Sequence, residues 1–147
     1  MLISKAYDYA IRILRALAAV PRGEQLTLDE ICQREHVPRS FGSKIARMLT
    51  AAELLEGNRG TNGGYRLAVP LERISIYDIG VAVDGVDAIN RRMAVNRCTL
   101  EDESCPNYSR DGVQCAVHGF LCEVQNEIVH KLKAKSMADL LSGRLLH

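Results

Sequence analysis

A glycine-rich stretch between two short apolar runs limits most strongly what this chain can fold into. Residues 54–67, LLEGNRGTNGGYRL, are typical of a strand, a tight turn and a returning strand. We expect Asn62, Gly63 and Gly64 to supply the positive φ angles at which the chain reverses. The pattern therefore predicts one small hairpin in a chain whose other segments are patterned for helices.

Three helices are predicted before this hairpin. The first extends from Ile3, with apolar residues at helical spacing, and stops at Pro21. Residues 27–30, TLDE, form a capping box that satisfies free backbone amides, so a second helix begins there and continues to about Val37. Residues 38–40, PRS, then break and restart the chain. The expected buried stripe of the third helix is Ile45, Met48, Leu49, Ala52 and Leu55.

The second and third helices and the turn between them predict a helix-turn-helix, whose later helix lies in the DNA major groove. The hairpin that follows directly then corresponds to a wing, with Arg59 at the tip, where it can enter a minor groove. A winged helix that binds another protein is the alternative that the same pattern allows. Salt dependence separates the two, because neutralising phosphates makes affinity fall steeply with added salt.

A loop between two helices is predicted for the second half of the chain. Residues 75–78, SIYD, form a capping box for a helix that ends at residues 84–85, and a loop follows. Residues 96–114 show no sustained periodicity and carry cysteines. From Cys115 to Lys133 the apolar residues recur four, three, four and four apart, which predicts one long amphipathic helix.

Residues 136–139, SMAD, cap a last short helix. The predicted fold class is mainly α with a small β-hairpin, a winged helix-turn-helix domain plus a long dimerisation helix. We divide the chain into a DNA-binding domain at 1–85, a cysteine-containing sensor loop region at 86–114, and a dimerisation helix with the C-terminal short helix at 115–147. A second copy is expected because a helix-turn-helix reads two half-sites about 34 Å apart only when two copies are held together.

Charge is unevenly distributed, although the formal net charge is only +1. Residues 39–66 include five basic and two acidic side chains, whereas residues 97–127 include six acidic and two basic ones. We interpret the basic segment as the part that meets phosphates. No run approaches the roughly 20 apolar residues of a membrane span and the first residues lack a secretory signal, so we expect a cytoplasmic protein without a membrane partner.

Five cysteines in a chain with no export signal are expected to stay reduced. Cys32 stands alone within the second predicted helix, and we interpret it as a small buried apolar residue. The other four fall within residues 98–122.

Three segments resemble the Rrf2 family of winged helix-turn-helix regulators. They are residues 4–10, SKAYDYA, the hairpin residues 59–67, RGTNGGYRL, and residues 115–118, CAVH. The resemblance implies a homodimer on a palindromic double-stranded DNA operator, with the third helix in the major groove and the wing in the minor groove. The DNA-binding residues carried over or predicted beside them are Arg39, Ser40, Phe41, Ser43, Lys44, Arg47 and Arg59. Of these, Phe41 also fits a core aromatic, and Arg47 a solvated charge.

Several members of this family hold an iron-sulfur cluster on three cysteines of the loop, and the candidates here are Cys98, Cys105 and Cys115. Thiolates are the soft ligands that such clusters need. The fourth ligand is then one of Asp8, His118 and Cys122. The spacing departs from the family, because six residues separate the first two candidate cysteines and nine separate the next two.

Two alternatives to the cluster remain open at the level of sequence. The cysteines can be redox-active thiols or plain loop residues, as in family members without a cofactor. Zinc is disfavoured because the short Cys-x2-Cys knuckles of structural zinc sites are absent from the sequence. We therefore expect either an iron-sulfur cluster or no cofactor.

We expect no enzyme, because the sequence has no Cys-x-x-Cys pair, no phosphate-binding loop and no Ser-His-Asp pattern. The predicted function is a homodimeric, DNA-binding transcription regulator that senses redox, iron-sulfur or nitric-oxide status through a cluster on the cysteine loop. The alternatives are a cluster-free regulator with thiol-based or small-molecule sensing, and a winged-helix module for protein interaction.

Overall fold

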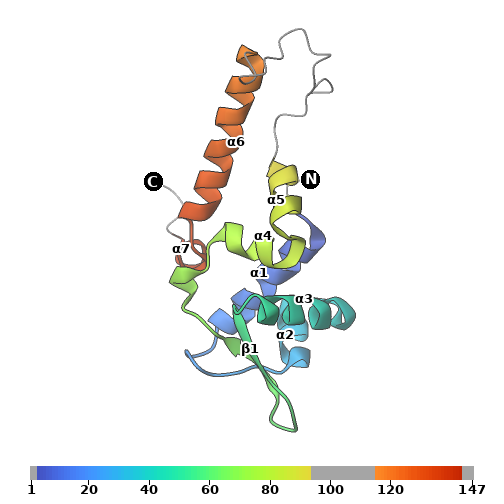
Figure 1. Ribbon diagram of the computed structural model, residues 1–147. Coiled ribbons are helices and arrows are strands. Elements are labelled where there is room, and N and C mark those ends of the chain that lie inside the picture. Colours follow the sequence, from blue (N-terminus) through green and yellow to red (C-terminus); the bar gives the residue numbers. More distant parts are fainter. Residues whose placement is uncertain (1–2, 94–114, 144–147) are drawn as a thin grey trace.

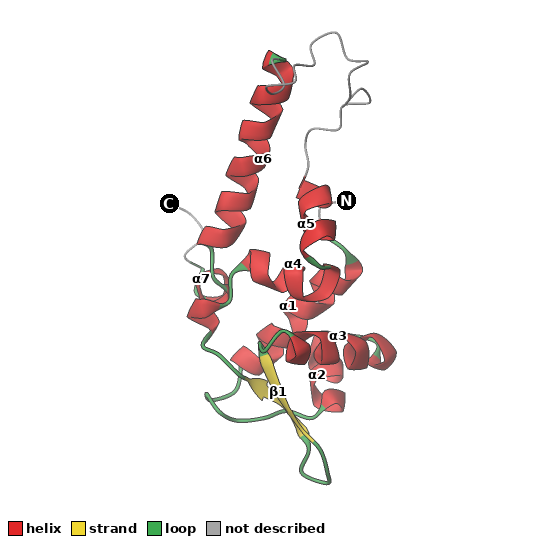
Figure 2. Ribbon diagram, viewed as in Figure 1, coloured by secondary structure: helices red, strands yellow, loops and turns green. Residues whose placement is uncertain are grey.

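The computed structural model describes residues 3–93 and 115–143. It is mainly helical with one two-stranded antiparallel hairpin, which confirms the predicted fold class (Figures 1 and 2). The elements in chain order are α1 (Lys5–Ala18), α2 (Leu28–Glu35), α3 (Arg39–Ala51), β1 (Leu55–Asn58), β2 (Gly64–Leu67), the 3-10 helix η1 (Leu71–Arg73), α4 (Ile76–Asp84), α5 (Val86–Met93), α6 (Ala116–Ala134) and α7 (Met137–Leu141). None of the described helices is both long and apolar enough to cross a bilayer.

Helix α1 is the central scaffold and packs against α2, α3 and α4. The Ser4 hydroxyl begins it by accepting a hydrogen bond from the Tyr7 amide, at 3.0 Å. The buried residues of α1 are Tyr7, Ala10, Ile13, Leu14, Ala16 and Leu17, which recur at the spacing of one helical face. The Tyr7 hydroxyl donates to the carbonyl of Ile76 at the start of α4, and burial raises the pKa of this tyrosine. One side chain thus joins the first helix to the fourth.

The helix-turn-helix is formed by α2 and α3. The predicted capping box at the start of α2 is present: Thr27 accepts from the Glu30 amide and the Glu30 carboxylate accepts from the Thr27 amide, at 3.2 and 2.7 Å. Helix α2 ends two residues earlier than the predicted limit, because His36 adopts a left-handed conformation with φ of 52°. Gly42 of α3 lies so close to α2 that a Cβ there would be 2.6 Å from the Cys32 sulfur. Cys32 is buried, as predicted.

The wing, residues 55–67, pairs Leu55 with Leu67 and Asn58 with Gly64. The predicted source of its reversal is wrong, because Gly60 is the described wing residue with a positive φ, 112°. Gly63 and Gly64 are required for close approach instead: a Cβ on Gly63 would be 2.7 Å from the carbonyl oxygen of Asn58. A Cβ on Gly64 would be 2.6 Å from the carbonyl oxygen of Leu26. The wing is therefore packed tightly against the loop before α2.

The buried stripe predicted for the third helix is partly wrong at its end. Ile45 and Leu49 are buried on α3 and Met48 packs partly buried against the core. Ala52 is exposed because the helix has already ended at Ala51, and Leu55 is buried as the first residue of β1.

The second half of the chain follows the predicted capping boxes. Ser75 and Ser136 each cap a helix, α4 and α7, through an aspartate three residues later. The loop predicted directly after Gly85 is wrong over its first eight residues, which form α5. Helix α6 begins after Cys115 as predicted, and Figure 1 shows its first turn at the end of the molecule opposite the wing.

Candidate nucleic-acid interface

Helix α3 has one face in the core and one face toward solvent. Its buried residues are Gly42, Ile45, Ala46 and Leu49. Four of the predicted DNA-binding residues, Ser40, Ser43, Lys44 and Arg47, are spaced three, one and three residues apart, which places them on the opposite face. Ser40, Lys44 and Arg47 are exposed and Ser43 is partly buried. A polar row on one face of a helix-turn-helix's second helix is the arrangement that enters a major groove.

Phe41 lies at the edge of this row. It is not a core residue, but part of its ring is covered by another side chain. It is 49% exposed, and its ring lies 5.6 Å from that of Tyr9, tilted by 50°. This aromatic pair connects the first turn of α3 to α1. The exposed part of the Phe41 ring remains available for an apolar contact with a thymine methyl group.

Two of the basic residues in segment 39–66 are already paired. Arg39 Nε is 2.5 Å from an oxygen of Asp29, and this carboxylate raises the pKa of the guanidinium. Arg66 Nη2 is 2.6 Å from Glu56, directly across the hairpin. Lys44, Arg47 and Arg59 have no ion-pair partner within the described residues. Of the five basic side chains in residues 39–66, these three therefore carry the positive charge that is not paired with a carboxylate.

The start of α3 differs from those of its neighbours. Pro38 occupies the N-cap and no side chain caps the helix, nor does its first turn contain an acidic residue. Helices α2, α4 and α7 instead have full capping boxes. The first backbone amides of α3 thus stay unsatisfied by side chains, which is the arrangement that accepts an anionic phosphate.

The position of the wing is set by a loop that sequence reasoning did not single out. Leu26, just before α2, exchanges two backbone hydrogen bonds with Tyr65 of β2, at 3.0 and 2.8 Å. The Gln25 amide donates to the carbonyl of Asn62, and Asn58 donates to Gln25 Oε1 at 3.1 Å. The one available signal was the isolated apolar Leu26 in a polar stretch. Arg59 extends from a wing that is thus held to the helix-turn-helix.

The candidate cluster ligands are only partly described. Cys115 is the N-cap residue of α6, and His118 and Cys122 follow three and seven residues later, on the same side of the helix. Asp8 lies on α1, 2.9 Å from Arg12. Cys98 and Cys105 lie outside the described residues. Within residues 3–93 and 115–143, no three histidine, cysteine or acidic side chains lie close enough together to hold a metal ion.

Comparisons with known proteins agree on the class of protein. The family model of Rrf2, described as an iron-dependent transcriptional regulator, matches residues 3–143. YwgB of Bacillus subtilis, named as a helix-turn-helix type of regulator, is 26% identical over 141 residues, 96% of this chain and 85% of that protein. Protein aau3 of Rhizobium meliloti is 31% identical over 146 residues, 98% of this chain and 87% of its own length.

Solved structures support the same fold. CymR, the global cysteine regulator of B. subtilis, superposes with a TM-score of 0.73 at 20% identity over 95% of both chains. IscR of T. potens superposes with a TM-score of 0.63 at 18% identity over 97% of this chain and 87% of that one. The chain belongs to the Rrf2 family of transcriptional regulators.

Proposed function

We propose that two copies of this chain bind a palindromic DNA operator, with α3 in the major groove and the wing in the adjacent minor groove. The observation that carries this proposal is the polar row Ser40, Ser43, Lys44 and Arg47, which lies opposite the buried face of α3. The uncapped start of the same helix supplies backbone amides for a phosphate. Arg59 extends the contact from the wing.

The proposed homodimer is supported by α6. No residue of this helix is buried within the chain, although Ile128 and Leu132 pack partly buried against the core. Toward its start, Val117 is 66% exposed and Phe120 is 63% exposed. Large apolar side chains that project from a helix end mark an interaction surface. If the partner is the α6 of a second copy of the chain, that copy also brings the second α3, which reads the second half-site.

Selection of bound sequences from a random duplex library tests the operator proposal. Wild-type protein should enrich an inverted repeat whose half-sites are separated by about one helical turn, near 34 Å. The Lys44→Ala variant should enrich the same repeat more weakly, because it removes one positive charge from the proposed DNA-binding face of α3. Enrichment of no sequence at all by the wild-type protein would contradict operator binding.

We further propose that the cysteine region senses redox or iron status, with an iron-sulfur cluster as the form of the sensor. The residue types fit: Cys115 lies at the N-cap of α6 with His118 three residues later, and thiolates are soft iron ligands. Within the described residues these side chains do not by themselves complete a metal site. The family description as iron-dependent and the structural likeness to an IscR support the same direction. When bound, a cluster would supply a redox-sensitive group that reacts with oxidants or nitric oxide.

Anaerobic reconstitution with iron and sulfide tests the cluster. The wild-type protein should take up both elements and absorb visible light, and Cys115→Ser should lose most of this uptake. The matched control is Cys32→Ser, whose sulfur is buried between α2 and α3 and should not affect the cluster. A colourless wild-type protein without iron or sulfide would favour cluster-free thiol sensing and leave the DNA proposal intact.

A further inference from the structure

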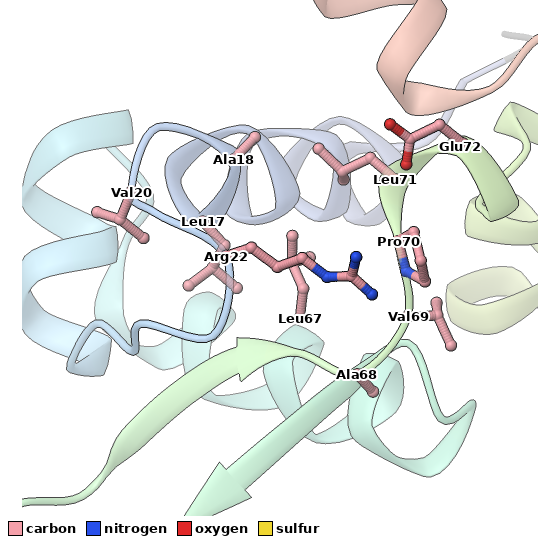
Figure 3. A pocket seen from close by; sticks show the side chains of 10 residues that line it. All are labelled: Leu17, Ala18, Val20, Arg22, Leu67, Ala68, Val69, Pro70, Leu71 and Glu72. Atoms are coloured by element: carbon pink, nitrogen blue, oxygen red, sulfur yellow. The ribbon is translucent and has the colours of Figure 1, made fainter.

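A cavity of about 250 Å³ lies between the end of α1 and the segment that follows the wing (Figure 3). Leu17 and Val20 line it from the side of α1 and the next loop. Leu67, Val69 and Leu71 line it from the end of β2 and the start of η1. These aliphatic walls are continuous with the hydrophobic core. The volume is below the usual range of drug-sized pockets, which favours a small ligand.

Two oppositely charged side chains border these apolar walls. Figure 3 shows the Arg22 side chain extended across the cavity toward Pro70, and the Glu72 carboxylate beside Leu71. Within the described residues, neither Arg22 nor Glu72 makes a salt bridge. The two are therefore not neutralised by each other. One cation, one anion and an aliphatic wall match a ligand that carries all three complementary features.

We propose that this cavity binds a small zwitterion, an α-amino acid with an aliphatic side chain. The ligand carboxylate pairs with the guanidinium of Arg22, which can donate two parallel hydrogen bonds to the carboxylate oxygens. The ligand ammonium faces Glu72, and its side chain contacts Leu67 and Val69. A purely apolar ligand would leave both charged side chains without an ion-pair partner. A simple anion would pair with Arg22 but would be repelled by the carboxylate of Glu72.

A ligand in the cavity would affect the position of the wing through backbone contacts. The loop that carries Val20 and Arg22 continues to Leu26, which is hydrogen-bonded to Tyr65 of the wing. The opposite wall begins at Leu67, the last residue of β2. A ligand that contacts both walls therefore restrains the wing relative to the loop before α2. That regulatory consequence rests on the proposed DNA binding, whereas binding of the amino acid does not.

Isothermal titration calorimetry of the full chain with L-leucine tests the site without DNA. Leucine should bind saturably, and Arg22→Gln should weaken it by at least about tenfold, the equivalent of one lost charged hydrogen bond. Leucinamide, which lacks the carboxylate, and 4-methylpentanoate, which lacks the ammonium, should both bind more weakly than leucine. Glu72→Gln should weaken leucine and leave 4-methylpentanoate unweakened.

The matched control is Arg73→Gln, an exposed neighbouring arginine that does not line this cavity. No heat from leucine, valine or alanine, or equal weakening by Arg22→Gln and Arg73→Gln, would overturn the site. Hydrogen exchange tests the coupling separately: leucine should slow amide exchange in residues 20–27 and 64–69 more than in α6. Unchanged exchange in those segments despite leucine binding would overturn the link to the wing.

Discussion

Individual side chains decide which charges of this regulator are available to DNA. Arg39 and Arg66 each form an ion pair within the protein, with Asp29 and Glu56 respectively. Arg59 extends from the wing without an ion-pair partner in the part of the chain that the structure describes. A residue's place in the sequence therefore does not by itself show whether it is free to contact phosphate.

Arg59→Ala should weaken operator binding by about 1–3 kcal/mol, because a guanidinium in a groove is lost. Fluorescence anisotropy with a duplex from the selection measures this change. Arg73→Ala removes an equal charge from η1, outside α3 and the wing, and is the control. An unchanged affinity for Arg59→Ala would show that the wing does not contact DNA.

Glu30 makes the stability of α2 depend on pH. Hydrogen bonds from the backbone and hydroxyl of Thr27 lower the pKa of this carboxyl from its ordinary value of 4.5. The folded state thus favours the carboxylate, so its stabilisation is full above pH 4.5 and is lost as pH falls through the folded-state pKa.

Glu30→Ala should consequently lower the melting temperature more at neutral pH than at a pH below the folded-state pKa, where the carboxyl is protonated in both states. Thermal unfolding followed by circular dichroism gives the comparison. Thr27→Ala is the matched variant, because it removes the hydroxyl donor and keeps the backbone donor, and it should lose only part of the pH-dependent stabilisation. A melting difference that is independent of pH would show that the capping box contributes no such stabilisation.

At the scale of elements, the helix-turn-helix depends on the close contact of α2 and α3. A Cβ on Gly42 would lie 2.6 Å from the Cys32 sulfur and 3.5 Å from Leu28. Gly42→Ala should therefore destabilise the fold by about 1–3 kcal/mol, although alanine favours helices. Urea unfolding measures the loss.

The double variant Cys32→Ala/Gly42→Ala separates the contact from other causes. Removing the sulfur makes room for the new methyl group. The double variant should therefore lose less unfolding free energy than the two single variants lose in sum. Strict additivity would contradict the contact. The same comparison also shows whether Cys32 contributes by packing alone.

Local sequence signals predicted the elements whose ends are set by neighbouring residues. The capping boxes at Thr27, Ser75 and Ser136 are present because each needs only a partner three residues away. The polar row of α3 was likewise predictable from its spacing. These signals gave the helix-turn-helix and the wing with few errors of position.

The missed features depend on contacts between distant parts of the chain. Helix α5 has only a short amphipathic pattern, and its buried Ile89 packs so close to Gly80 that a Cβ there would be 2.5 Å away. The pairing of Leu26 with Tyr65 joins residues that are far apart in sequence. Neither contact has a signature in a short window, because the partner is supplied by the tertiary fold.

At the scale of the whole molecule, the proposed DNA-reading and dimer-forming surfaces lie at opposite ends. The wing projects from one end and the first turn of α6 from the other (Figure 1). The cysteines at the start of α6 lie at the end away from the wing, so a signal received there has to pass through the body of the protein. Dimer geometry is the most direct means, because it sets the distance between the two α3 helices.

Phe120→Asp should weaken self-association by at least about tenfold, because it places a charge in the proposed apolar interface. Size-exclusion chromatography with light scattering over a range of protein concentrations measures the change. Asn126→Asp adds the same charge on a different, exposed face of α6 and should leave the dimer intact. Equal behaviour of the two variants would place the dimer interface elsewhere.

Binding of the wild-type protein to its selected duplex over a series of salt concentrations tests most directly whether α3 and the wing bind DNA. If Lys44, Arg47 and Arg59 each neutralise one phosphate in both copies, log K should fall with log salt at a slope of about −5. Lys44→Ala should reduce the magnitude of that slope by about 2. An affinity that hardly changes with salt, or a slope that Lys44→Ala leaves unaltered, would contradict DNA binding through this surface.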